Sequence, residues 1–252
     1  MDKLNKIYGF QAVKEALKAG WEFESISVHR KMSRATTKLI SEAEGKGIKV
    51  LRVSKHDLEK LVSTDRHQGI VAIVAAKGSG GPSSVEEILS YAEKRGEPPF
   101  VLLLDGIQDP QNLGALLRSA HALGVHGVIL PDRRACKVTP AVVKVSAGAA
   151  AHMRIATVTN LKRSLDQLKE SGLWCAAAVM DGQPASECEL TGPLALVVGA
   201  EGDGVRKTVI EACDFKVCVP LAGQFDSLNA GVAGGILIYE IIRQRGEKSK
   251  IS

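Results

Sequence analysis

The sequence predicts an α/β protein with a small N-terminal part and a larger C-terminal part built on a parallel sheet. Short apolar runs alternate with segments of helical period along most of the chain, which is typical of βαβ units. The strongest run, residues 101–104, is continuously apolar, as expected of a strand covered on both faces. A stretch rich in Gly, Ser and Pro, residues 77–84, interrupts the alternation and is typical of a linker.

The N-terminal part, residues 1–77, is expected to be a small α/β fold. We expect helices over 11–19, 36–45 and 56–62, and strands over 25–28, 48–53 and 70–75. This part holds 15 Lys and Arg residues against 9 Asp and Glu, whereas the rest of the chain is close to neutral. A polyanion partner is therefore indicated. The basic stretch 29–38 is a candidate contact loop for nucleic acid, and a merely solvated loop is the alternative.

Residues 78–98 are expected to form a linker in which a short helix over 85–94 can form, and residues 99–252 the larger part. In that part we expect strands over 101–104, 125–130, 154–158, 173–179, 194–198 and 216–219. The expected helices cover 113–123, 139–147, 161–169, 205–212 and 227–244.

Composition excludes several classes of protein. No apolar run approaches the roughly 18 residues that cross a bilayer, and the first residues do not form a signal peptide. A cytoplasmic protein without a membrane partner is expected. The five cysteines include no C-x-x-C pair, so we expect buried free thiols rather than disulfides. The six histidines are scattered, and no metal site is expected.

Ligands of open parallel sheets bind beyond the carboxyl ends of the strands, and three such ends carry unusual residues here. The first follows strand 101–104 and leads to Asn112, which is expected to cap a helix. Arg118 lies further along that helix, directly after Leu116 and Leu117. Capping alone would explain Asn112, and solvation would explain Arg118, although its apolar neighbours disfavour that reading.

The second strand end is rich in glycine and the third in small residues. Gly199, Gly202 and Gly204 follow strand 194–198 and allow the backbone to approach a ligand, while Glu201 suits a cationic or hydrogen-bond-donating group better than a phosphate. Their G-x-x-G-x-G spacing is neither a dinucleotide fingerprint nor a P-loop. Ser227 is a candidate cap of the last helix, whose run 230–235 predicts a close helix contact, within the chain or between subunits.

Together these three segments resemble the three motifs of the SpoU/TrmH family of RNA ribose 2′-O-methyltransferases. Asn112 to Arg118 is similar to N-x-G-x-x-x-R, residues 199–202 to the second motif, and Ser227-Leu228-Asn229 to the third. Residues 7–9 and 67–72 are similar to the substrate-binding domain of the rRNA guanosine methyltransferase branch. The resemblance covers nearly the whole chain.

The resemblance implies a C-terminal domain (99–252) with a deep trefoil knot, an exception to the usual unthreaded topologies, and an N-terminal domain (1–77) that binds RNA. It implies S-adenosylmethionine as cofactor, rRNA as partner, a homodimer, and a transferred methyl group on a ribose 2′-hydroxyl. The implied cofactor-binding residues are Gly199, Gly202, Val219 and Leu228, and the implied catalytic residues are Asn112, Arg118, Glu201, Ser227 and Asn229.

Three alternatives remain at this point. A tRNA ribose methyltransferase would use the same knot, but the separate basic N-terminal part favours rRNA. A non-catalytic RNA-binding or ribosome-assembly factor would be expected to have lost some of the five catalytic residues. A nucleotide-dependent oxidoreductase does not match the glycine spacing.

Overall fold

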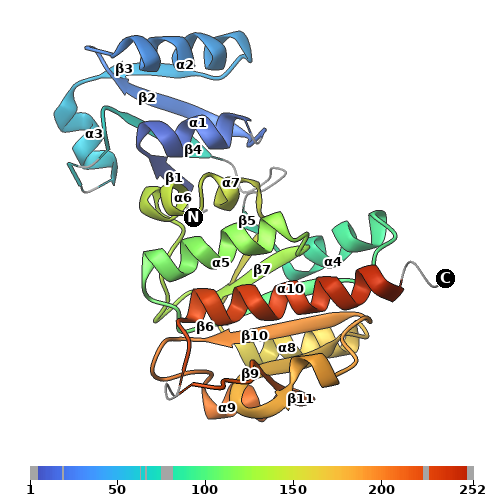
Figure 1. Cartoon of the computed structure of the whole chain (residues 1–252). Helices are drawn as coiled ribbons and strands as arrows, with labels where there is room; N and C mark the ends of the chain where they lie inside the picture. The colour runs from blue at the N-terminus through green and yellow to red at the C-terminus, as the bar shows by residue number, and fades with distance from the viewer. Residues whose placement is uncertain are drawn as a thin grey trace.

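The computed structural model describes residues 5–18, 20–62, 64–65, 67–74, 82–223 and 227–248. Within them the chain forms two sheets, each with its own helices (Figure 1). The N-terminal elements are β1 (Asn5–Tyr8), α1 (Phe10–Lys18), β2 (Phe23–His29), α2 (Arg34–Gly45), β3 (Val50–Val53), α3 (Lys55–Val62) and β4 (Ile70–Val74). The C-terminal elements are β5 (Pro82–Ser83), α4 (Val85–Lys94), β6 (Phe100–Asp105), α5 (Pro110–Ala122), β7 (Gly127–Pro131), α6 (Pro140–Val145), α7 (Ala149–His152), β8 (Ile155–Val158), α8 (Leu161–Glu170), β9 (Trp174–Pro184), the 3₁₀ turn η1 (Ala185–Glu187), β10 (Leu194–Gly199), α9 (Lys207–Ile210), β11 (Phe215–Cys218) and α10 (Ala230–Lys248).

The N-terminal sheet is mixed, with strand order β1-β4-β2-β3. Strand β4 pairs antiparallel with β1 and β2, and β3 pairs parallel with β2. Apolar residues of α1, α2, β2 and β4 form one core cluster in the N-terminal part. Strand β1, residues 5–8, was not expected, because a four-residue segment with two polar side chains carries almost no periodic signal.

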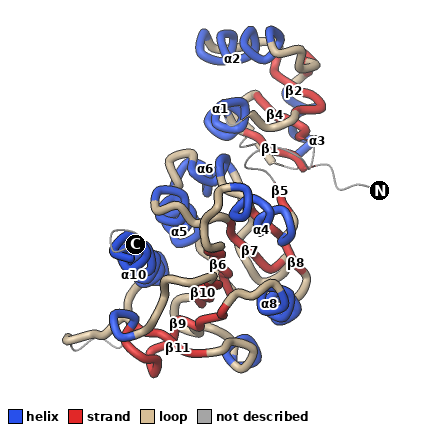
Figure 2. Tube along the Cα trace, turned by 90° about the vertical axis from the view of Figure 1, so that its right-hand side faces the viewer, coloured by secondary structure: helices blue, strands red, loops and turns tan. Residues whose placement is uncertain are grey.

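The C-terminal sheet has the order β11-β9-β10-β6-β7-β8-β5, and all its pairings are parallel. The prediction of a parallel α/β sheet is confirmed. Strand β6 shows why its sequence is continuously apolar: Phe100, Leu102 and Leu104 face one core cluster, whereas Val101 and Leu103 face another. Helices α5 and α10 cover the first face and α8 the second (Figures 1 and 2).

Helix α5 begins earlier than the sequence suggested, and the expectation that Asn112 caps it is wrong. Asp109 is the cap, because its carboxylate accepts a hydrogen bond from the Asn112 backbone nitrogen at 3.1 Å. Pro110 occupies the first helical turn, where its missing N–H costs nothing. The Asn112 side chain is thereby free for contacts outside the helix.

Helix α10 begins at Ala230, and the expectation that Ser227 caps it is also wrong. The Asn229 side-chain oxygen accepts hydrogen bonds from the backbone nitrogens of Gly231, at 3.0 Å, and Val232, at 3.3 Å. The small residues that follow permit a close helix contact within the chain. A Cβ on Gly231 would lie 3.1 Å from the Ala115 Cβ on α5, and one on Gly234 would overlap Leu116.

Other boundaries differ as well. The helix expected over 139–147 is two, α6 and α7, because Ala147 and Gly148 between them have positive φ angles of 51° and 91°. The helix expected over 205–212 is reduced to the four residues of α9. Residues 78–98, expected as a linker, include β5, which pairs with β8, and α4, whose Val85 and Ile88 lie in the C-terminal core.

The two parts of the chain meet where α1 packs on α6 and α7. The Trp21 indole N–H donates a hydrogen bond to the Ala151 carbonyl, and Ala12 of α1 belongs to the core cluster of α5 and β6. All five cysteines are free, as expected, although only Cys175 is fully buried. None of the helices among the described residues is long and apolar enough to cross a membrane.

Candidate functional site

The candidate site lies at the carboxyl edge of the C-terminal sheet. Strands β6 and β10 are neighbours and end in register, at Asp105 and Gly199. The loop after β6 leads to α5, the loop after β10 holds the expected glycines, and the segment after β11 leads to α10. This is the edge at which open parallel sheets bind their ligands.

Three residues from these three segments form one hydrogen-bonded cluster, which we call the amide–carboxylate cluster: Asn112, Glu201 and Asn229. The Glu201 Oε2 accepts from the Asn112 Nδ2 at 3.2 Å and from the Asn229 Nδ2 at 3.1 Å. The Asn229 Nδ2 also donates to the Asn112 Oδ1 at 2.7 Å. The three are 89, 28 and 117 positions apart in sequence, so only the fold brings them together.

The geometry fixes which way both amides point. Because the Asn229 Oδ1 accepts from the backbone at the start of α10, its Nδ2 must face Asn112 and Glu201. Asn112 must then present its Oδ1 to Asn229 and its Nδ2 to Glu201. The second carboxylate oxygen, Glu201 Oε1, has no partner among the described residues, so the cluster can accept one more hydrogen bond from a ligand.

Arg118 and Ser227 lie outside this cluster. Arg118 is exposed on α5 and makes no hydrogen bond or ion pair with any described residue. Six positions separate it from Asn112, which is about 9 Å along the helix and places the two side chains on different sides. Ser227 is exposed and lines the cavity described next.

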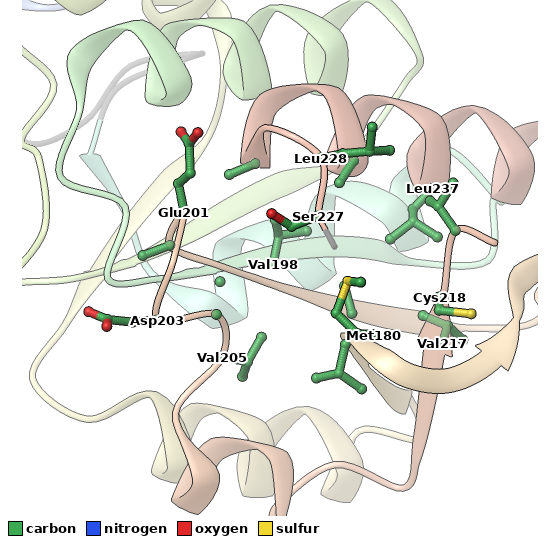
Figure 3. Close-up of a pocket in the computed structure, with 18 of the residues that line it drawn as sticks. Met180, Val198, Glu201, Asp203, Val205, Val217, Cys218, Ser227, Leu228 and Leu237 are labelled. Carbon is green, nitrogen blue, oxygen red and sulfur yellow. The ribbon is translucent and has the colours of Figure 1, made fainter. Parts of the chain in front are cut away.

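A cavity of about 360 Å³ opens beside the cluster. Its walls come from the glycine loop after β10, from β11 and the following segment, and from the start of α10 (Figure 3). The four residues expected to bind the cofactor, Gly199, Gly202, Val219 and Leu228, all line it. The Glu201 side chain points from the loop towards α5 rather than into the centre of the cavity (Figure 3).

Two glycines of the loop are required there for different structural reasons. A Cβ on Gly199 would overlap the backbone of Gly204 and Val205, because Ala200 and Gly204 pair and fold the loop back on itself. Gly202 has a φ of 88°, a conformation that disfavours residues with a Cβ. The loop therefore presents its backbone closely to whatever occupies the cavity.

Asp105 anchors this loop, and the sequence reasoning missed it. Its side chain is 1% exposed. Its carboxylate accepts from the Arg206 backbone nitrogen at 2.9 Å and from the guanidinium Nε and Nη2 of Arg206 at 2.8 Å. A charge-assisted clamp of this kind fixes the point at which the loop ends. The sequence feature that could have identified Asp105 is its position as a carboxylate at the end of a fully apolar strand.

The charge of the lining restricts the ligand. Among the described lining residues the charged side chains are Glu201 and Asp203, and none is Lys, Arg or His. The floor is apolar, with Val198, Val217 and Leu237. Both carboxylates point away from the centre of the cavity (Figure 3). A lining that is apolar and holds no cation fits an apolar ring system and does not fit the phosphates of a dinucleotide. No group of His, Cys, Asp or Glu suited to a metal occurs among the described residues.

Comparisons with known proteins match both parts of the chain. The family model of the SpoU rRNA Methylase family matches residues 99–239, and that of RNA 2′-O ribose methyltransferase substrate binding matches residues 6–80. The chain is 41% identical over 249 residues, 97% of this chain and 98% of the other, to the 23S rRNA (guanosine-2′-O-)-methyltransferase RlmB of Coxiella burnetii.

Solved structures are also similar. The SpoU methyltransferase AviRb from Streptomyces viridochromogenes, in complex with the cofactor AdoMet, has a TM-score of 0.74 and 23% identity, covering 96% of this chain and 90% of that one. This likeness shows the fold. The A. aeolicus TrmH/SpoU tRNA modifying enzyme has a TM-score of 0.56 and 28% identity, covering 65% of this chain and 85% of that one.

Proposed function

This chain belongs to the SpoU rRNA methylase family, and we propose that it transfers a methyl group from S-adenosylmethionine to the ribose 2′-hydroxyl of a guanosine in 23S rRNA. The observation that carries the proposal is the amide–carboxylate cluster on the rim of the glycine-loop cavity. Relatives of nearly equal length that carry this activity in their name support the choice of substrate.

The cavity fits S-adenosylmethionine on its own chemistry. The absence of a Cβ at Gly199 lets the loop fold back tightly and present its backbone to the cavity, the apolar floor suits an adenine ring, and the lining holds no cation that would repel a sulfonium. When bound, the cofactor supplies an electrophilic methyl group on a sulfonium. Gly199, Gly202, Val219 and Leu228 would hold it, mainly through the backbone. Alignment of the hydroxyl with that methyl can contribute several kcal/mol to the rate.

We assign positioning and charge stabilisation to five residues, and the proton of the 2′-hydroxyl passes to the Glu201 Oε1 or to water. Asn112, Glu201 and Asn229 orient one another and present the free Glu201 oxygen to the ribose or to the Arg118 guanidinium. Arg118 stabilises the developing alkoxide and the adjacent phosphate as a bidentate donor. A guanidinium stays charged in proteins, so this role is favoured over that of general base. Ser227 donates to a phosphate or to the reacting hydroxyl.

The N-terminal part supports rRNA over tRNA as substrate. We propose that residues 1–77 form the RNA-binding domain and residues 99–252 the methyltransferase domain, with β5 and α4 joined to the latter. The tRNA-modifying structure covers only about two thirds of the chain, whereas the rRNA-modifying relative covers nearly all of it. An rRNA substrate is met during ribosome assembly, which favours the cytoplasm.

The experiment is transfer of labelled methyl from S-adenosylmethionine to RNA from a strain that lacks this gene, separated into rRNA and tRNA. We expect label in large-subunit rRNA. Label in tRNA alone would replace the proposed substrate by the alternative. No label in either fraction, with the cofactor still bound, would favour the non-catalytic alternative.

We also propose that the C-terminal domain contains the trefoil knot that the family resemblance implies. Strand β11 lies at one edge of the sheet, and described residues between it and α10 line the same cavity as the glycine loop: Val219, Leu221, Ser227 and Leu228. This arrangement supports threading of the C-terminal segment. A crystal structure in which the traced backbone is not knotted would contradict this proposal.

A homodimer through α5 and α10 is our proposal for the assembly. Val232, Ile236 and Tyr239 form an apolar stripe on the outer side of α10 and are 50%, 41% and 58% exposed. Arg118 faces outward from the neighbouring helix, so such a dimer would bring it to the interface. We expect sedimentation to give twice the chain mass of 26.8 kDa, and Ile236→Glu to shift the protein towards monomer. A wild-type protein that sediments as one chain at micromolar concentration would refute the dimer.

A further inference from the structure

Four cations follow strand β7 in the C-terminal part, in the loop that leads to α6 and in α6 itself. Arg133, Arg134 and Lys137 belong to residues 132–139, the loop between β7 and α6, and Lys144 lies in α6. We call these four residues the basic loop patch. All four are exposed, and none makes a hydrogen bond or ion pair with any described residue through its side chain.

Some cations of the same part are paired, whereas these four are not. Arg206 pairs with Asp105, Lys216 with Asp181, and Arg243 with Glu240 and Glu247. The basic loop patch also has little acidic compensation of its own. The loop contains one carboxylate, Asp132. Four cations without partners, close together in the sequence, attract a polyanion.

The loop is held in place by its uncharged residues. The Cys136 backbone nitrogen donates to the Ile107 carbonyl at 2.7 Å, and the Cys136 and Val138 side chains pack on the core. Arg134 has a positive φ of 55°, a conformation that a non-glycine residue adopts at a cost and that the surrounding contacts must maintain. The cations therefore extend from a fixed backbone.

The patch lies between the candidate site and the N-terminal part. Ile107 belongs to the loop from β6 to α5, and Asp109 of that loop caps the helix that carries Asn112. The hydrogen bond from Cys136 to Ile107 places the basic loop at this helix end, where burial and the Asp109 carboxylate raise the pKa of the Cys136 thiol. On the other side, α6 packs on α1 of the basic N-terminal part (Figure 1).

We propose that the basic loop patch binds phosphates of the RNA strand that flanks the target ribose, and so guides that strand from the amide–carboxylate cluster towards the N-terminal part. The proposal rests on the proposed function, since it assumes an RNA substrate. Phosphate contacts fix the position and register of the nucleic acid without reading its sequence. The patch therefore sets affinity for RNA and not the identity of the modified nucleotide.

The test is the double variant R133Q/R134Q, with K162Q/R163Q as the matched control. Lys162 and Arg163 are also adjacent, exposed and unpaired through their side chains, but they lie on α8, which covers the opposite face of the sheet. The measurements are the affinity for in-vitro transcribed 23S rRNA at several salt concentrations, the KM for that RNA, and the Kd of S-adenosylmethionine.

We expect R133Q/R134Q to weaken RNA binding about tenfold and to reduce the slope of log affinity against log salt by roughly 1.4, the value for two phosphate contacts to a single strand. The Kd of the cofactor should be unchanged, and the control should match the wild type. Equal KM and salt slope in both double variants would overturn the proposal. Loss of activity on ribosome precursor particles but not on naked RNA would also overturn it, because the partner would then be a protein. A wild-type enzyme inactive on every RNA would instead refute the proposed function.

Discussion

Replacing Arg118 with alanine is expected to reduce methyl transfer by at least about 100-fold, the typical cost of removing one donor that stabilises developing negative charge. The side chain is exposed and has no partner among the described residues, so the free energy of unfolding should change by no more than about 0.5 kcal/mol. The Kd of S-adenosylmethionine should also be unchanged, because Arg118 does not line the cavity. Single-turnover transfer to RNA, thermal unfolding and calorimetry measure the three quantities.

Arg163→Ala is the matched control, since Arg163 is another exposed helical arginine without a side-chain partner. Arg118→Lys separates charge from geometry: a lysine keeps the charge but loses the planar fork. We expect this variant to recover only part of the activity. Turnover of Arg118→Ala near the wild-type level would remove Arg118 from the chemistry.

The second large effect is expected for Gly199→Ala, which should lower the affinity for S-adenosylmethionine by about 10- to 100-fold. The new methyl group would overlap the backbone of Gly204 and Val205, so the loop that lines the cavity must move. Backbone cannot give way as a flexible side chain does, and overpacking of this kind typically costs 1–3 kcal/mol or more. Calorimetric titration of the cofactor measures the loss directly.

Gly192→Ala serves as the control, because a Cβ at Gly192 meets no atom within 4 Å and its φ is not positive. This variant should bind the cofactor as the wild type does. Circular dichroism and thermal unfolding would verify that Gly199→Ala retains the fold. A folded Gly199→Ala protein with unchanged affinity would mean that the cofactor binds elsewhere.

The C-terminal architecture was accessible from the sequence because burial on both faces leaves a strong pattern. Residues 101–104 and 194–198 read as continuous apolar strands and are neighbours at the centre of the sheet. Strand order was not accessible, since parallel pairing at this sheet depends on which helices cover which face. Strands β1 and β5 were not expected from the sequence, because they are short edge strands whose pairing depends on tertiary contacts.

The sequence named Asn112, Glu201 and Asn229, which the fold brings together, but did not predict how they are arranged. Asn112 and Ser227 were expected to cap helices, yet Asp109 and Asn229 do so. Several polar residues stood before each helix, and sequence alone does not say which one satisfies the first backbone N–H groups. This difference matters for function. Because Asn229 caps α10 with its side-chain oxygen, its amide nitrogen must face Asn112 and Glu201, and this orients the whole amide–carboxylate cluster.

Asp105 shows a further limit. A carboxylate at the end of an apolar strand was visible in the sequence, but its partner Arg206 lies 101 positions away. Only the parallel pairing of β6 with β10 brings the two together. An ion pair between residues far apart in sequence leaves no pattern in the sequence around either residue. The glycines of a tight loop, in contrast, can be recognised in the sequence itself.

The most direct test of the central claim is to identify the methylated nucleoside itself. Unmodified 23S rRNA is incubated with the protein and S-adenosylmethionine carrying a labelled methyl group, digested to nucleosides and separated by mass spectrometry. The account predicts label in 2′-O-methylguanosine, and its loss with Arg118→Ala. Label on a base, or no label in an RNA that the protein binds together with its cofactor, would contradict it.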